Sequence, residues 1–138
     1  FVGICLGLQL LFDSSEEFGD YSGLGLIKGK VKKFKFHYHN STKYPVPQIG
    51  WNKISRNGYS WGNTLLCNNT NDDFMYFVHS YFVEPENDNI MLSKTTYGNT
   101  EYCSSIQQNN IFACQFHPEK SGEIGINIYK NIKEEYCS

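Results

Sequence analysis

The hydrophobic positions change their spacing within the first twelve residues. Residues 1–4 form an apolar run typical of the end of a buried strand, and the leucines that follow recur at helical intervals up to Phe12. The turn sequence Gly3-Ile4-Cys5-Leu6-Gly7 separates the two patterns. The chain is therefore predicted to begin with a strand, a sharp turn that carries a thiol, and a helix that ends in the polar stretch 14–20.

Two later segments have the patterns of strands. Residues 31–39 alternate, so Phe34, Phe36 and Tyr38 are expected on one face, with lysines and histidines on the other. Residues 74–84 are almost entirely aromatic or β-branched. That composition predicts a strand buried on both faces.

The last third of the chain predicts strands followed by a helix. Residues 90–96 have a strand pattern, and residues 101–107 are expected to pair with residues 111–116 as a hairpin across an asparagine turn. Residues 122–136 repeat isoleucine at helical spacing, which predicts an amphipathic helix. Its buried face is expected to consist of Ile124, Ile128 and Ile132.

Composition limits the size and the partners of the protein. The 138 residues, 40% of them hydrophobic, suffice for one domain with a core. A net charge of -2 argues against nucleic acid or an anionic membrane as the main partner. No stretch approaches the roughly 20 apolar residues of a membrane span. The cysteines are odd in number and lack C-x-x-C spacing, so neither a disulfide framework nor a zinc site is expected, and a reducing cytoplasm fits best.

Three histidines invite a functional interpretation that the surrounding residues do not favour. His37 and His39 could bind a metal, but they share a strand face with lysines and have no carboxylate or thiol nearby in sequence. A solvated strand face is preferred, and no metal or other cofactor is expected. His79 lies in the middle of an apolar strand, where a hydrogen-bonded core histidine is the preferred interpretation.

Cys5 is the first candidate for chemistry. A nucleophile on a strained strand-to-helix turn leaves little room for neighbouring side chains, which gives Gly3 and Gly7 a purpose. The N–H groups of a following helix favour a thiolate, so the pKa of Cys5 is expected to be lowered. Gln9, one helical turn later, could bind a polar substrate beside the sulfur. The alternative is that Cys5 is a small buried hydrophobic residue.

The sequence His117-Pro118-Glu119 is the second candidate. Proline forces the preceding residue into an extended conformation, so the side chains of His117 and Glu119 are expected to project to the same side. A carboxylate can then orient its neighbouring imidazole, and the imidazole can take a proton from a thiol. Together with Cys5, these residues supply a nucleophile, a base and an orienting group.

The motifs Gly3-Ile4-Cys5-Leu6-Gly7-Leu8-Gln9 and Gln115-Phe116-His117-Pro118-Glu119 together resemble the type I (triad) glutamine amidotransferases. Segments 23–25, 46–52, 76–81 and 117–121 resemble the glutaminase subunits of imidazole glycerol phosphate synthases within that family. The resemblance implies an α/β, three-layer fold with a central mixed sheet. It also implies that residues 1–138 are the C-terminal two-thirds of one domain, without its first βα units and oxyanion loop, so this stretch alone is expected to fold poorly and to be inactive.

The resemblance also implies roles for individual residues in hydrolysing L-glutamine to glutamate and ammonia. It makes Cys5 the nucleophile, His117 the general base and then acid, and Glu119 its orienting residue. The backbone N–H of Leu6 is expected to donate to the oxyanion. The residues expected to hold the substrate glutamine are Gln9, Ser80 and Tyr81.

A partner is implied as well. The resemblance predicts a heterodimer with a (β/α)8-barrel cyclase subunit, which uses the ammonia to make imidazole glycerol phosphate and AICAR in histidine biosynthesis. The residues expected at that interface are Pro47, Gly50, Trp51, Tyr76 and Lys120. For Trp51 this reverses the interpretation from the residues alone, which favours a buried core position.

One departure leaves the acceptor open. Histidine-pathway members more often carry histidine where this sequence has Gln48. Segments 102–105 and 112–114, together with Gln48, resemble paralogous subunits that supply ammonia for amino-sugar and surface-polysaccharide synthesis. A third alternative is a non-catalytic scaffold that only binds a partner, although all three triad residues are present.

Overall fold

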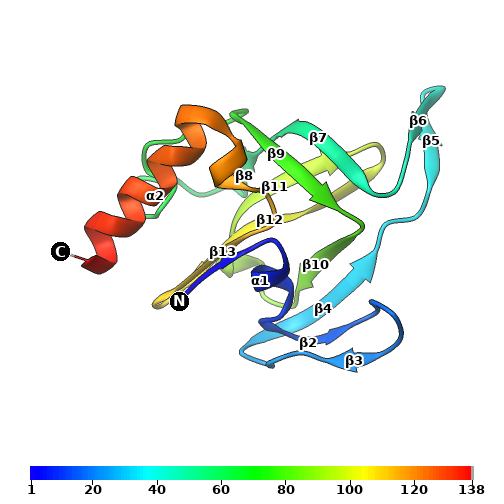
Figure 1. The fold of residues 1–138 in the computed structure, drawn as a ribbon, viewed down its shortest axis with the longest axis horizontal. Coiled ribbons are helices and arrows are strands. Elements are labelled where there is room, and N and C mark those ends of the chain that lie inside the picture. The colour runs from blue at the N-terminus through cyan, green and yellow to red at the C-terminus, as the bar shows by residue number, and fades with distance from the viewer. Residues whose placement is uncertain (138) are drawn as a thin grey trace.

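The structure, a computed structural model, describes the backbone of residues 1–137 and the side chains up to residue 135. A curled sheet runs through the centre of this part, with helix α2 (Gly122–Cys137) along one side (Figure 1). The strands of this sheet are β1 (Val2–Ile4), β2 (Phe12–Ser15), β3 (Tyr21–Ser22), β4 (Ile27–Lys33), β8 (Ser55–Arg56), β10 (Tyr81–Pro85), β11 (Met91–Tyr97), β12 (Thr100–Gln108) and β13 (Ile111–Cys114). Their order is β1-β13-β12-β10-β4-β2-β3, and β11 pairs with both β12 and β8.

The sheet is mixed, because β1 runs parallel to β13 and β2 parallel to β4, whereas its other pairs are antiparallel. The remaining elements form two small sheets and short helical turns. They are the hairpin β5 (His37–His39) and β6 (Thr42–Tyr44), the antiparallel pair β7 (Gln48–Lys53) and β9 (Phe74–His79), helix α1 (Leu6–Gln9), and 3-10 helices at Asp88–Ile90 and Pro118–Lys120. This architecture confirms the α/β fold class.

Side chains of β13 enter two hydrophobic cores, one on each face of the sheet. Phe112 and Cys114 belong to the cluster that contains Ile128 of α2. Ala113, between them, belongs to the cluster that contains Leu8 of α1. This division follows from the two-residue period of a strand, which points successive side chains to opposite faces. The sheet is therefore packed against α2 on one face and against the α1 turn on the other.

The predicted C-terminal hairpin and helix are confirmed, but the expected buried face is correct only in part, because Ile128 is buried and Ile132 partly buried whereas Ile124 is 37% exposed. Ile128 anchors the helix. Its side chain is fully buried. We expect Ile128→Ala to lower the free energy of unfolding by about 2–5 kcal/mol, because the lost methyl groups leave a cavity. Urea unfolding of the two proteins measures the difference. The matched control is Ile126→Ala, on the same helix with a side chain 43% exposed, and an equal loss in both variants would contradict this assignment of the core.

The prediction for residues 6–20 is wrong beyond the first helical turn. The helix ends at Gln9, and Phe12–Ser15 forms β2 beside β4 instead of continuing the helix and entering a loop. The helical spacing covers too few residues to stabilise a helix by itself, and a short helix depends on tertiary packing. Pairing with β4 gives the backbone of β2 hydrogen-bond partners and buries Phe12 completely.

The single strand predicted at residues 31–39 is two strands. Strand β4 ends at Lys33, and the chain leaves the sheet for the β5–β6 hairpin, which projects from the body of the protein (Figure 1). Phe34 is buried as expected, but Phe36 and Tyr38 are 53% and 64% exposed. Apolar and polar residues do alternate along this segment, but no element in the described part of the chain covers the hairpin in the way that the sheet covers Phe34.

Residues 74–84 also form two strands, so the prediction of one strand buried on both faces is wrong. Strand β9 pairs with β7, whereas β10 lies in the large sheet between β4 and β12. Met75, Phe77 and His79 are buried, and the residues between them are more exposed. The more exposed face of β9 also carries aromatic side chains, so its sequence has the pattern of a strand that is buried on both faces.

Candidate active site

Cys5 lies on a strained turn between β1 and α1. Its φ of 52° and ψ of -104° are unusual for a residue with a side chain, and its backbone N–H donates to the carbonyl of Cys114 at 2.8 Å. A Cβ on Gly3 would lie 2.7 Å from the carbonyl oxygen of Gly7, so the turn requires glycine at position 3. A Cβ on Gly7 would meet no atom of the described residues within 4 Å, so these residues give no steric reason for the second glycine.

The expected lowering of the Cys5 pKa is wrong for this structure. Burial of the thiol raises its pKa, and the backbone N–H of Leu6 and the side chain of Gln115 oppose that effect without cancelling it. Helix α1 has only four residues, so little helix dipole is available to stabilise a thiolate. The thiol therefore needs a base to become a nucleophile.

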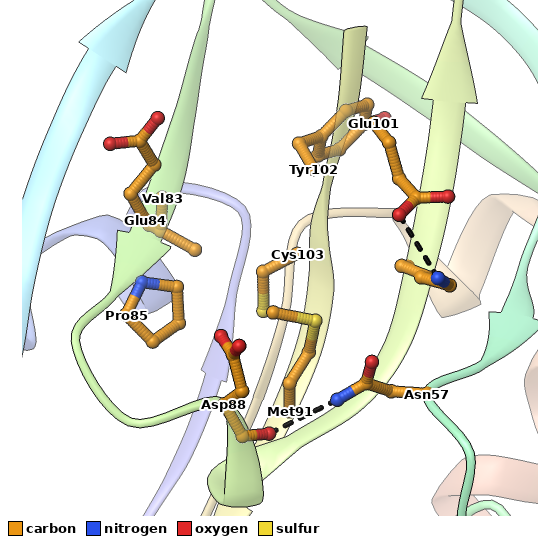
Figure 2. A pocket seen from close by; sticks show the side chains of 10 residues that line it. Asn57, Val83, Glu84, Pro85, Asp88, Met91, Glu101, Tyr102 and Cys103 are labelled. Carbon is orange, nitrogen blue, oxygen red and sulfur yellow. Dashed lines mark hydrogen bonds and ion pairs between the residues drawn. The ribbon is translucent and has the colours of Figure 1, made fainter.

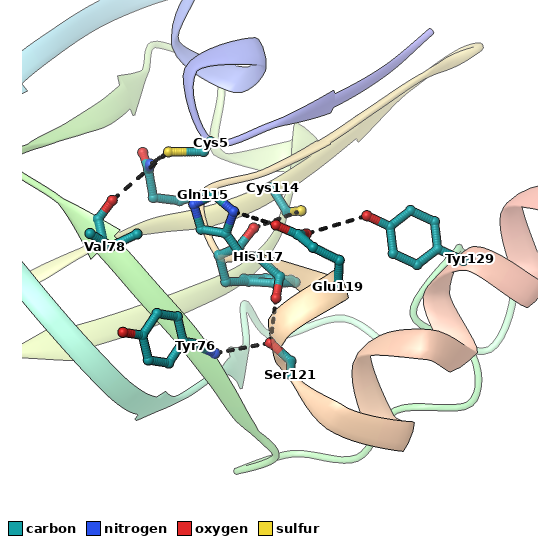
Figure 3. Close-up of polar contacts among 10 residues, drawn as sticks. Cys5, Tyr76, Val78, Cys114, Gln115, His117, Glu119, Ser121 and Tyr129 are labelled. Carbon is teal, nitrogen blue, oxygen red and sulfur yellow. Dashed lines mark hydrogen bonds and ion pairs between the residues drawn. The ribbon is translucent and has the colours of Figure 1, made fainter.

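His117 and Glu119, the predicted base and its predicted orienting group, are hydrogen-bonded to each other. Nδ1 of His117 lies 2.6 Å from Oε1 of Glu119 (Figure 3). His117 is extended, with φ -103° and ψ 95°, as the following proline predicts. The hydroxyl of Tyr129 donates to the other carboxylate oxygen at 3.3 Å. Burial acts to raise the pKa of Glu119, but hydrogen bonds from its own backbone and from His117 outweigh burial and lower it.

The second ring nitrogen of His117, Nε2, is buried and has no hydrogen-bond partner among the described residues. With a carboxylate on Nδ1, this nitrogen carries the lone pair that can accept a proton. The described hydrogen bonds of the Cys5 sulfur go to Gln115 Nε2 at 3.6 Å and the Val78 carbonyl at 4.0 Å, and none joins it to the imidazole. The structure thus places the three predicted triad residues in the same region, but the described contacts include no hydrogen bond between the Cys5 sulfur and the His117 ring.

A cavity of about 450 Å³ lies beside the thiol. All the residues predicted to hold the substrate line it, which are Leu6, Gln9, Ser80 and Tyr81. Sequence reasoning missed Glu17, Phe18 and Lys33, which come from segments after β2 and at the end of β4. Their patterns contain no chemical signal, and only the curled sheet places them here.

His79 also lines this cavity, yet it is the hydrogen-bonded core residue that the sequence predicts. Its Nδ1 bonds the carbonyl of Tyr81 at 2.7 Å, and Nε2 lies 3.2 Å from the hydroxyl of Tyr102. Burial lowers the pKa of His79 to about 4, so the ring is neutral at neutral pH.

The residues predicted at a partner interface lie mostly together on the β7–β9 side of the protein. Trp51 is 56% exposed and packs edge to face against Tyr76, with 5.9 Å between ring centroids. Lys120 Nζ lies 5.9 Å from the centroid of the same tyrosine ring. Pro47 is exposed and Gly50 partly exposed on the same segment. The exposure of Trp51 contradicts a core position and is compatible with an interface.

A second cavity, of about 440 Å³, lacks the chemical features of the first (Figure 2). Two of its carboxylates are paired, Glu101 with Lys94 at 2.9 Å and Glu84 with Lys32 at 2.7 Å. Burial raises the pKa of its Cys103 thiol, which makes the thiol unreactive. This cavity therefore lacks an activated nucleophile.

The described residues contain no group of three histidine, cysteine or acidic side chains able to hold a metal, and no helix long and apolar enough to cross a membrane. Cys5, Cys67, Cys103 and Cys114 are free thiols, and the side chain of Cys137 lies outside the described part.

Comparison with known proteins finds a family match along nearly the whole chain. The sequence profile described as "Glutamine amidotransferase class-I" matches residues 1–133. The imidazole glycerol phosphate synthase subunit HisH of Chlorobaculum tepidum is 41% identical over 133 residues, covering 96% of this chain and 62% of that protein. Subunit HisH 1 of Legionella pneumophila strain Lens is 41% identical, with 96% and 63% covered. The chain thus spans less than two-thirds of the length of these relatives.

Two solved structures share the fold at low sequence identity. A protein from Thermoplasma acidophilum that is described as a GMP synthase subunit has a TM-score of 0.57 at 19% identity, covering 94% of this chain and 53% of that one. A glutamine amidotransferase from Thermotoga maritima also has a TM-score of 0.57, at 17% identity, covering 98% and 48%.

Proposed function

Since the chain belongs to the class-I glutamine amidotransferase family, we propose that it carries a glutaminase centre that hydrolyses the side-chain amide of L-glutamine to glutamate and ammonia. The observation that carries this proposal is the combination of two features. Cys5 occupies a strained turn beside a substrate-sized cavity, and the His117–Glu119 pair is already formed at 2.6 Å. These are the nucleophile and oriented base that acyl transfer requires.

The first half of the reaction follows from these positions. The thiol proton of Cys5 passes to Nε2 of His117, and the sulfur electron pair attacks the side-chain carbonyl carbon of glutamine. In this proposal the backbone N–H of Leu6, which acts on the Cys5 sulfur, donates to the oxyanion. The C–N bond then breaks, and the leaving nitrogen takes the proton from His117 and departs as ammonia.

The second half regenerates the thiol. A water molecule gives a proton to His117 as its oxygen attacks the thioester, the C–S bond breaks, and the proton returns to Cys5. Glu119 holds the imidazole tautomer throughout, because its carboxylate accepts from Nδ1 and is itself held by Tyr129.

We further propose that the ammonia is delivered to a cyclase barrel subunit in histidine biosynthesis. The relatives at about 41% identity support this, since their names place them in imidazole glycerol phosphate synthase. The departure at Gln48 carries less weight against it than the sequence suggests. Gln48 is buried and accepts from the hydroxyl of Tyr102 at 3.0 Å, so its side chain is not part of the partner-facing surface.

The decisive experiment measures glutamate release by the protein expressed from its complete gene, first alone and then with the nucleotide ligand and the cyclase subunit of the histidine pathway. Stimulation by both additions is the expected result. Turnover that the cyclase does not change would favour a role like that of the paralogous subunits in polysaccharide synthesis. The absence of turnover with any partner would favour a non-catalytic scaffold.

Trp51 is the residue expected to contribute most to partner binding. An exposed tryptophan supported by an aromatic neighbour is a typical interface anchor, so Trp51→Ala should weaken the complex by about 2 kcal/mol or more. Isothermal titration with the cyclase subunit measures the loss. Tyr59→Ala is the control, because Tyr59 is similarly exposed but bonds Asn89 away from β7. Equal effects of both changes would place the interface elsewhere.

A further inference from the structure

Gln115 has no role in the chemistry above, yet its side chain is hydrogen-bonded both to the Cys5 thiol and to Gln9, which lines the cavity. It follows β13 directly and is completely buried. Its Oε1 accepts from Nε2 of Gln9 at 3.0 Å, and its Nε2 lies 3.6 Å from the sulfur of Cys5. Figure 3 shows the end of the Gln115 side chain beside the sulfur.

The direction of these hydrogen bonds is determined by a backbone carbonyl. Nε2 of Gln9 donates to the carbonyl oxygen of Tyr81 at 3.1 Å. A carbonyl can only accept, so the nitrogen of the Gln9 amide must face Tyr81. Its second hydrogen then faces Gln115, which must present oxygen to Gln9 and nitrogen to Cys5. Reversing either amide would place two acceptors or two donors together in a buried site.

We propose that Gln115 is a positioning residue that holds an N–H donor on the sulfur of Cys5 and, through its oxygen, orients the amide of Gln9. The donor favours the thiolate over the thiol during attack, because an anion accepts a stronger hydrogen bond. Both donors of Gln9 are occupied, so only its oxygen remains to accept from a substrate N–H. The proposal rests on the proposed function in taking Cys5 as the nucleophile.

Other charged and titratable groups near the thiol must be separated from this effect. Glu119 and Glu17 act to raise its pKa, opposing the Gln115 donor. Other titratable groups near the sulfur are His117 of the triad, Lys33, His79 and Tyr81 in the cavity wall, and Cys114. A substitution confined to Gln115 leaves all of them in place.

The test measures alkylation of Cys5 by iodoacetamide against pH, without glutamine, by mass spectrometry of the peptide that contains it. The exposed thiol of Cys67 in the same samples is the internal reference. Gln115→Met removes both hydrogen bonds at similar volume. Gln115→Glu keeps an acceptor for Gln9 but places a carboxylate, which ionises before the thiol, beside the sulfur. The control is Gln107→Glu, at a glutamine whose Oε1 accepts from the backbone of Leu65 outside the site.

Both Gln115 variants should raise the midpoint of Cys5 alkylation by about one pH unit, and Gln107→Glu should not. In turnover, Gln115→Met should raise KM and lower kcat, whereas Gln115→Glu should lower kcat with little change in KM. The proposal would be overturned if the pH midpoint of Cys5 alkylation were unchanged in both Gln115 variants. It would also be overturned if a lower melting temperature were the only effect of the substitutions. Alkylation does not require turnover. An inactive wild-type protein would therefore contradict the proposed function, while the alkylation test of Gln115 could still be carried out.

Discussion

Cys5→Ser is expected to reduce glutamine-dependent turnover by a factor on the order of 10⁴ to 10⁶. The substitution keeps the size of the side chain and the turn geometry, but a serine hydroxyl is a much weaker acid than a thiol, and α1 is too short to compensate. Glutamate release under saturating glutamine measures the loss. Binding of the partner subunit should be unaffected, because the turn backbone is unchanged.

Cys67→Ser is the matched control for this prediction. Cys67 is an exposed free thiol outside the cavity, and its replacement should leave turnover unchanged. Turnover by Cys5→Ser close to that of the wild type would show that a different group attacks the substrate. In that case the strained conformation at Cys5 would need another explanation.

His117→Ala should lower kcat by a factor on the order of 10⁴, since the buried thiol would lose the base that removes its proton. The ring nitrogen Nε2 is buried without a partner among the described residues, so removing the ring breaks no other bond at that atom. Single-turnover measurements of ammonia release separate this chemical step from product release.

The control for this prediction is His39→Ala. His39 is exposed on the β5–β6 hairpin and contacts Asn40 at 3.3 Å. Its loss should change neither turnover nor stability. If His117→Ala retained wild-type turnover, the imidazole would not be the base, and the pair with Glu119 would have only a structural role.

Local interactions make much of the protein predictable from its sequence. The turn at Cys5, the extended residue before Pro118 and the helix that contains Ile128 depend on neighbours within a few residues. Steric restriction by glycine and proline and the helical period act over that range. The candidate triad can accordingly be predicted from these motifs without knowledge of the fold, whereas Ser80 and Tyr81 are predicted to hold the substrate only from the family resemblance.

The errors occur where a distant segment decides the outcome. Phe12 enters a strand because β4 is available to pair with it, and Phe36 stays exposed because the hairpin leaves the sheet. Likewise, the pKa of Cys5 depends on how deeply the fold buries the thiol. Sequence pattern describes which residues could be covered, but it contains no information on which segment covers them.

The sequence by itself identified the candidate reactive groups, predicted the strained turn at Cys5 and determined the family to which the chain belongs. Only the tertiary structure decided that Gln9, Tyr81 and Gln115 form one directed set of hydrogen bonds ending at the sulfur of Cys5. These residues lie on α1, β10 and the chain after β13, and the order and register of the sheet bring them together. The donor and acceptor of an N–H···O hydrogen bond must lie about 2.7–3.2 Å apart, and packing supplies the precision that this narrow range requires.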